Sequence, residues 1–246
     1  MIPAAGTLPE PCYDAWMTGR LIGTELRTWR PQPFGRRRAR DVREPIVEPL
    51  WSGDRVLLVM NSPDAEPEFY DTDGEALEGQ ALVPIAAELR AAMRTWSFVV
   101  DGYLTRQATM PEQGIDSGIA TPSAGQMVGQ MMFGRRLAEA VSAKTSTQEA
   151  ATDPSLPVCF VAIDLLAIDD DTLLDVPLLE RKRILDSAFE ERTLVRRTPF
   201  VRPPVRRWMV AWRGLGFREV AFKAANSRYT PGRSNEGWAA VPIPRR

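Results

Sequence analysis

Three lysine side chains are the candidates for amine chemistry in this chain: Lys144, Lys182 and Lys223. A neutral lysine amine can attack an electrophilic phosphorus atom if it is held in place and if cations stabilise the charge that develops. Lys144 lies in a polar stretch, Lys182 in the middle of a predicted helix, and Lys223 in a predicted strand. Lysine-based chemistry in this protein therefore has three possible sources.

The chain contains no histidine, which excludes Ser-His-Asp triads, Cys-His pairs and imidazole metal sites. Cys12 and Cys159 are far apart and fit no zinc spacing, so we interpret them as reduced, buried thiols of a cytoplasmic protein. No apolar run approaches the roughly 18 residues that a membrane span needs. The N-terminus also lacks the basic-then-apolar order of a signal peptide. We therefore expect no membrane partner.

Arginine is concentrated in two segments, although the formal net charge is only −1. Residues 20–43 contain eight arginines, and residues 192–213 contain seven, with Trp208 and Trp212 among them and no acidic residue. Arginines interleaved with aromatic residues can bind phosphates and stack on bases, which makes DNA an expected partner. The alternative is a solvated helix face with buried tryptophans. The excess of arginine over lysine is itself typical of a GC-rich genome.

A mixed α+β domain must position these side chains. Apolar runs and alternation predict strands at residues 54–61, 66–70, 97–105, 158–168, 193–201, 218–224 and 236–243. Helical spacing predicts helices at residues 82–96, 124–143, 175–189 and 205–214, with a short helical pattern around 16–29. In the third of these helices, Asp175 is expected to cap the N-terminus and Pro177 to lie in the first turn.

The composition divides the chain into an Arg/Pro-rich N-terminal arm, residues 1–45, and a main domain, residues 46–246. An insertion rich in Gln, Ser, Thr, Gly and Ala interrupts the main domain at about residues 106–153. The arm is expected to be a loop or an extended segment.

Four stretches, in the right order, resemble the adenylation (covalent nucleotidyltransferase) domain of ATP-dependent DNA ligases. They are "VEPLWSGDRVLLV", "FVVDGYL", "FVAIDLLAIDDDTLLDVPLLERKRILDSAF" and "LGFREVAFKAANSRYTPGRSNEGW", which together span roughly residues 46–243. The matching residues are Glu48, Pro49, Gly53, Arg55, Asp101, Gly102, Leu104, Asp164, Leu165, Leu166, Lys223, Ser227, Tyr229, Pro231, Gly232, Arg233 and Trp238. The resemblance implies an ATP-grasp-like nucleotidyltransferase fold with antiparallel sheets flanked by helices. It also implies a following OB-fold domain, which we expect to be absent here.

The departures from the family pattern fall on the residues that do its chemistry. Leu50 occupies the position of the nucleophilic lysine, and Ser52 the position of an aspartate. Tyr103 and Arg218 replace two glutamates that would organise Mg²⁺, and a guanidinium repels that ion. The Lys-x-Lys after Trp238 is also missing. We therefore expect no catalytic residue and no metal site.

The resemblance nevertheless leaves a set of candidate nucleotide-binding residues: Glu48, Arg55, Ile163, Lys223 and Arg233. Glu48 stands where the family reads the adenine edge, and Ile163 replaces the aromatic residue that would stack on adenine. The three cations would line the pocket and bind ATP or AMP weakly, without metal. The alternative is that these residues now serve packing and solubility.

Three functions follow as hypotheses. The first is a non-catalytic subunit that binds DNA or a repair partner. The second is an active ATP-dependent ligase or nucleotidyltransferase that is completed by a partner. The third is a purely regulatory protein that pairs with an intact ligase, which an exposed apolar patch would favour.

Overall fold

The computed structural model describes residues 29–62, 64–107, 156–169 and 171–244. The predicted helices at residues 16–29 and 124–143, together with Cys12 and Lys144, lie outside the described residues, apart from Trp29. The same holds for nearly all of the predicted insertion. Cys159 is buried and free, as expected.

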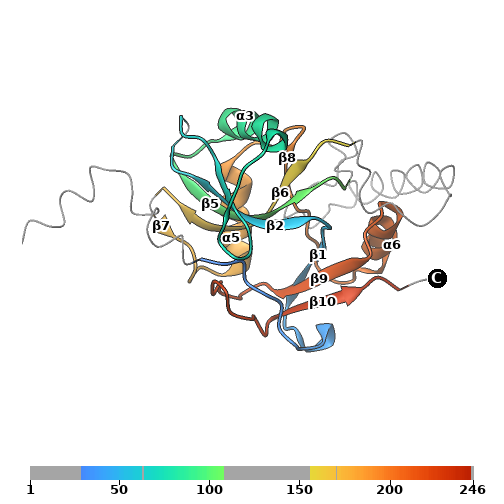
Figure 1. Ribbon diagram of the computed structural model, residues 1–246. Helices are drawn as coiled ribbons and strands as arrows, with labels where there is room; N and C mark the ends of the chain where they lie inside the picture. Colours follow the sequence, from blue (N-terminus) through green and yellow to red (C-terminus); the bar gives the residue numbers. More distant parts are fainter. Residues whose placement is uncertain (1–28, 63, 108–155, 170, 245–246) are drawn as a thin grey trace, which may run out of the picture.

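The larger of two sheets forms the centre of the molecule (Figure 1). Its strand order is β4-β3-β2-β5-β6-β7, all antiparallel, and β8 pairs with β6 in parallel. The strands are β2 Asp54–Met60, β3 Glu68–Tyr70, β4 Ala76–Leu77, β5 Phe98–Thr105, β6 Cys159–Ile168, β7 Asp171–Thr172 and β8 Val195–Arg197. The long apolar runs predicted as strands thus form its middle.

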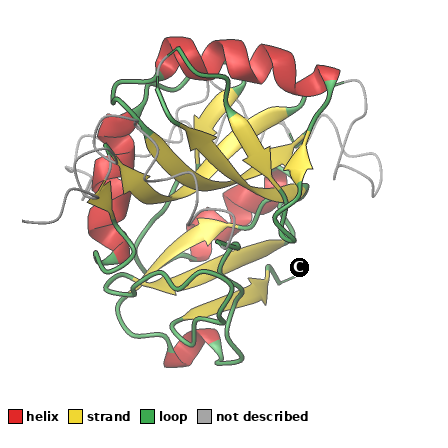
Figure 2. Ribbon diagram, turned by 60° about the vertical axis from the view of Figure 1, so that its left-hand side comes forward, coloured by secondary structure: helices red, strands yellow, loops and turns green. Residues whose placement is uncertain are grey.

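A second, three-stranded antiparallel sheet has the order β1-β9-β10. Its strands are β1 Pro45–Pro49, β9 Glu219–Ala224 and β10 Trp238–Pro242. The register places Glu48 beside Ala221 and Lys223 beside Trp238. Figure 2 shows the two sheets as separate layers of strands. The architecture is therefore the predicted α+β class with antiparallel sheets.

Within the described ranges, three helices surround the sheets: α3 Val83–Ala92, α5 Leu178–Ala188 and α6 Arg206–Gly214. Two short 3-10 helices, η3 Ala39–Asp41 and η4 Gln80–Leu82, precede β1 and α3. The prediction that Asp175 caps α5 is wrong. Pro177, rather than Asp175, occupies the N-cap position and forms no side-chain cap bond. Its backbone is not helical, so the helix begins at the next residue, Leu178. Asp175 instead pairs with Arg228, at 3.0 Å.

Alternation along the strands of the larger sheet gives it two buried faces. One face packs against α3 and α5, and its largest side chains include Leu58, Phe98 and Phe160. The opposite face turns toward the smaller sheet and carries Leu57, Val99 and Val161. A sheet that is buried on both faces can hold polar side chains inside the protein only if they are paired.

The described part of the N-terminal arm packs on the main domain rather than extending from it. The Gln32 backbone N–H donates to the Tyr229 hydroxyl at 2.8 Å, and the Gly35 N–H donates to the Trp238 carbonyl at 3.1 Å. Gln32 and Trp29 are buried. No helix in the described part of the chain is long and apolar enough to cross a membrane.

Candidate functional site

A buried ion triad lies between the smaller sheet and α5. The Glu48 carboxylate, on β1, binds two ammonium groups: Oε1 lies 2.6 Å from Lys182 Nζ, and Oε2 lies 2.8 Å from Lys223 Nζ. All three side chains are about 2% exposed. Burial alone would raise the pKa of Glu48, but the two ammonium groups outweigh burial and hold that pKa below its usual value.

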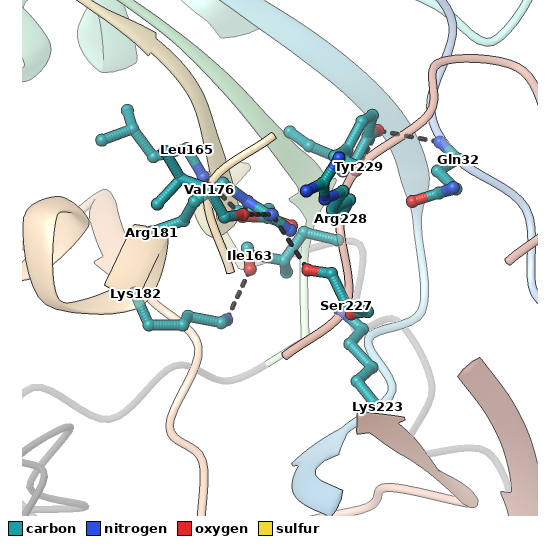
Figure 3. Close-up of polar contacts among 12 residues, drawn as sticks. Gln32, Ile163, Leu165, Val176, Arg181, Lys182, Lys223, Ser227, Arg228 and Tyr229 are labelled. Carbon is teal, nitrogen blue, oxygen red and sulfur yellow. Dashed lines mark hydrogen bonds and ion pairs between the residues drawn. The ribbon is translucent and has the colours of Figure 1, made fainter. Parts of the chain in front are cut away.

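The two lysines have further contacts that fix their positions. Lys182 donates to the Ile163 carbonyl on β6, and Figure 3 shows its side chain pointing toward that oxygen. Lys223 Nζ lies 4.5 Å from the centre of the Trp238 ring, within the range of a cation–π contact. Burial lowers the pKa of Lys182, and the nearby Glu48 charge opposes that change. Both amines are therefore buried and held by internal partners.

Leu50, at the position that corresponds to the family's nucleophile, packs against an apolar cluster between the two sheets. The cluster contains Trp51, Tyr103, Ile163, Trp212 and Phe217 among its buried members. The Trp51 and Phe217 rings meet edge to face, at 4.8 Å between centroids. Aliphatic and aromatic side chains therefore line one side of position 50.

Tyr103 is one of the two residues that replace glutamates of the family pattern. It is buried in this apolar cluster, and burial raises the pKa of its hydroxyl. Magnesium prefers several hard oxygen ligands. Among the residues that the structure describes, no group of three Asp, Glu, His or Cys side chains could hold a metal ion. The described residues around Tyr103 therefore offer no such set of ligands.

Arg218, the second such residue, is exposed and directly precedes β9. It lines a small cavity of about 180 Å³ together with Leu50, Trp51, Ser52, Gln107, Gly216, Phe217 and Glu219. The Ser52 hydroxyl and backbone N–H both donate to the Gln107 side-chain oxygen, at 3.0 and 3.2 Å. This volume is below the roughly 300 Å³ at which typical ligand pockets begin.

The second buried polar group is centred on Asp101, in the middle of β5. Arg55, on β2, donates two hydrogen bonds to its carboxylate, at 3.1 and 2.7 Å, and the Tyr229 hydroxyl donates a third, at 2.7 Å. Burial would lower the pKa of Arg55, but Asp101 raises it above the usual value. Burial raises the pKa of Tyr229 well above its usual value, and Asp101 adds to this effect. Arg55 is therefore committed to an internal partner.

A third buried pair joins α5 to the larger sheet. Arg181 Nη2 lies 2.7 Å from Asp164 Oδ2, both side chains are fully buried, and a second bond runs from Nε to Oδ1 at 2.8 Å. Arg181 also donates to the Val176 and Ser227 carbonyls (Figure 3). Its four hydrogen bonds thus hold a helix, a strand and a loop together.

Of the five residues predicted to bind a nucleotide, the structure brings three together: Glu48, Ile163 and Lys223 meet around Lys182. Arg55 lies instead in the Asp101 group, and Arg233 is exposed in the β9–β10 loop. The sequence reasoning treated Lys182 only as a residue in mid-helix and missed its position. A signal was present, because Leu178, Arg181, Lys182 and Leu185 share the i, i+3, i+4, i+7 spacing of a buried helix face.

Two glycines of the matching stretches are required by close packing. Gly53 has a φ of +128°, and a β-carbon there would lie 2.2 Å from the Leu104 carbonyl oxygen. At Gly102, a β-carbon would lie 2.5 Å from the Phe160 ring. The family residues retained in this chain thus include several with structural roles: Gly53, Arg55, Asp101, Gly102, Asp164, Tyr229 and Trp238.

Comparison with solved structures gives the same fold. The ligase domain from M. tuberculosis LigD matches with a TM-score of 0.57 and 20% identity, over 89% of this chain and 60% of that one. A mycobacterial DNA ligase D complexed with ATP and MES matches with a TM-score of 0.58 and 20% identity, over 88% of this chain and 60% of that one. The chain therefore spans about 60% of the length of these structures. No curated protein matches it.

The family model of the ATP-dependent DNA ligase domain matches residues 44–241, which is most of the chain. This range runs from β1 to β10 and includes both sheets and the three buried polar groups described above. On this match, the chain belongs to the ATP-dependent DNA ligase domain family.

Proposed function

We propose that this protein is a non-catalytic member of the ligase family that binds DNA. The observation that carries the proposal is the environment of Leu50, which has no lone pair and packs against the apolar cluster of Trp51, Tyr103 and Phe217. Transfer of AMP to the protein needs a nucleophilic amine at the α-phosphate. Lys182 and Lys223 are both bound to Glu48, which leaves neither available for that step.

We also propose that Glu48, Lys223 and their neighbours serve packing and ion pairing rather than a residual ATP or AMP site. Glu48 has both carboxylate oxygens occupied by lysines, and Arg55 is held by Asp101. Displacing such buried partners would leave charges without compensation. Calorimetry with millimolar ATP or AMP, without metal, is expected to show no saturable heat. A saturable isotherm would restore the nucleotide site.

The direct test is a mass measurement after incubation with ATP and Mg²⁺. We expect the intact mass to stay unchanged, both for the protein alone and with candidate partner proteins. An intact ligase of the same family, treated in parallel, serves as the positive control. A protein-bound AMP would overturn the non-catalytic proposal and favour an enzyme completed by an unexpected nucleophile.

DNA binding is tested separately by the anisotropy of a labelled duplex across a salt series. Binding through phosphate contacts predicts an affinity that falls steeply as salt rises, because counterions are released. Absent or salt-independent binding would contradict this half of the proposal. The regulatory alternative has less support, since the exposed large hydrophobic residues of the described chain, Val83, Trp96 and Val210, belong to three different segments.

A further inference from the structure

We infer that the solvent face of α6 and the segment before it bind the phosphodiester backbone of DNA through Arg202, Arg206 and Arg207. This inference rests on the proposed DNA binding and adds the surface that performs it. Of the seven arginines between residues 192 and 213, the inference assigns contact with DNA to three.

The first half of the arginine-rich segment is used inside the fold. Arg197 lies 2.7 Å from the carboxylate of Asp186 and 3.7 Å from that of Glu191. Arg192 donates to the Ala91 carbonyl at 2.9 Å, and Arg196 is only 9% exposed. Arg196 and Arg197 are therefore used inside the fold, and Arg192, although exposed, is bonded to the backbone of α3.

The second half presents its charges to solvent. Arg202, Arg206 and Arg207 are all exposed, and none of them forms an ion pair with any residue in the described ranges. Helix geometry places Arg206 and Arg207 on the same side as Val210, which is 49% exposed. α6 contains no acidic residue, so every charged side chain on it is positive.

The fold itself does not need these cations. Positive charges in the first turn of a helix oppose its dipole, and here Arg206 and Arg207 occupy that turn. The unpaired N–H groups of the same turn add to the positive potential. An exposed cation cluster of this kind is complementary to phosphate groups.

The inner face of α6 holds this surface rigidly and limits what it can read. Trp212 is fully buried, and Trp208 packs against it at 6.0 Å between ring centroids. The buried indole of Trp212 cannot stack on a base, which agrees for this residue with the alternative of buried tryptophans. Arg213 is tied to the Pro244 carbonyl. The surface therefore offers mainly guanidinium groups, which suits binding that is independent of base sequence.

The test compares two double variants with equal loss of charge. Arg206→Gln with Arg207→Gln removes two cations from α6. The control, Arg94→Gln with Arg183→Gln, removes two exposed arginines that are each paired with a glutamate. Affinity for a labelled duplex is measured between about 50 and about 200 mM salt. The α6 variant should bind roughly tenfold more weakly, and its salt slope should fall by about 2, while the control stays near the wild type. Arg206→Lys with Arg207→Lys should keep both values.

The outcomes separate the surface from the proposed function. If the wild type binds DNA and the α6 variant binds equally well, or the control weakens as much, the surface inference is wrong and DNA binding stands. If the wild type does not bind DNA, the proposed function fails and this inference falls with it. If α6 instead mediates binding to polyglutamate or to phosphatidylserine vesicles alone, the partner is not a nucleic acid. Melting curves of the variants check that each is folded.

Discussion

Glu48 and Lys182 form a 2.6 Å ion pair that joins β1 of the smaller sheet to α5. Because Lys223 binds the other carboxylate oxygen, a single anion serves two buried ammonium groups. The triad therefore carries an excess of one positive charge in an environment with low polarisability. Substitutions of its three members should therefore differ in how much they lower the stability of the fold.

Glu48→Gln should be the most damaging change in the triad. It leaves Lys182 and Lys223 facing each other without a counter-charge, and removing one partner of a buried ion pair typically costs about 3–5 kcal/mol. Lys182→Met should cost clearly less, because the Glu48–Lys223 pair remains balanced. Arg183→Met, on the exposed side of the same helix, should change stability by less than about 1 kcal/mol. Urea denaturation measures all three, and equal losses for Glu48→Gln and Lys182→Met would refute this charge argument.

Leu50→Lys should not restore adenylation. The new amine would lie beside Trp51 and Phe217, and Tyr103 and Arg218 would still occupy the positions of the two glutamates. Intact mass after incubation with ATP and Mg²⁺ should show no bound AMP. The triple variant Leu50→Lys, Tyr103→Glu and Arg218→Glu is measured in the same way for comparison. Adenylation by Leu50→Lys alone would mean that position 50 is the sole defect.

Tyr229 should make the protein less stable at alkaline pH. Its folded pKa lies well above the ordinary value of 10.0 because of burial. The unfolded tyrosine therefore loses its proton above about pH 10, while the folded one keeps it. The stabilisation is complete below pH 10 and is lost as the pH rises toward the folded pKa. Tyr229→Phe removes this pH dependence. The difference in stability between this variant and the wild type should therefore become smaller above pH 10. A deficit that stays constant would argue against the assignment.

Gly102→Ala should destabilise the larger sheet. A β-carbon at this position would lie 2.5 Å from the Phe160 ring and 2.7 Å from the Val161 carbonyl oxygen. Overpacking of this kind typically costs about 1–3 kcal/mol. Gly79→Ala is the matched control, because no heavy atom lies within 4 Å of a β-carbon there. Thermal melting compares the two, and similar midpoints would show that β5 and β6 can separate without cost.

The elements with the clearest sequence signals were predicted best. The apolar runs at β5 and β6 and the helical spacing of α5 have strong periodicity, and the structure confirms them close to their predicted ends. The prediction that Asp175 caps α5 was wrong. The backbone geometry of Pro177 sets the start of the helix, and the capping tendency of an aspartate two residues earlier does not.

The candidate site was predicted only in part, for a physical reason. The resemblance led to Glu48, Ile163 and Lys223, which do converge, and their role in nucleotide binding stays a prediction. Lys182 completes the group from a helix more than a hundred residues from Glu48 in sequence. Pairings of this kind depend on how α5 packs on the sheets, and no local pattern encodes them. The tertiary structure was likewise needed to separate the arginines by role. Arg197 is paired inside the fold, whereas Arg202, Arg206 and Arg207 are exposed.

The hydrogen bond from Tyr229 to Asp101 connects the β9–β10 loop of one sheet to the centre of the other. Separating the two sheets would break this buried contact and leave the carboxylate of Asp101 with Arg55 as its remaining side-chain partner. The two layers should consequently melt together in a single cooperative transition, so a calorimetric trace would contain one peak for the entire body of the protein.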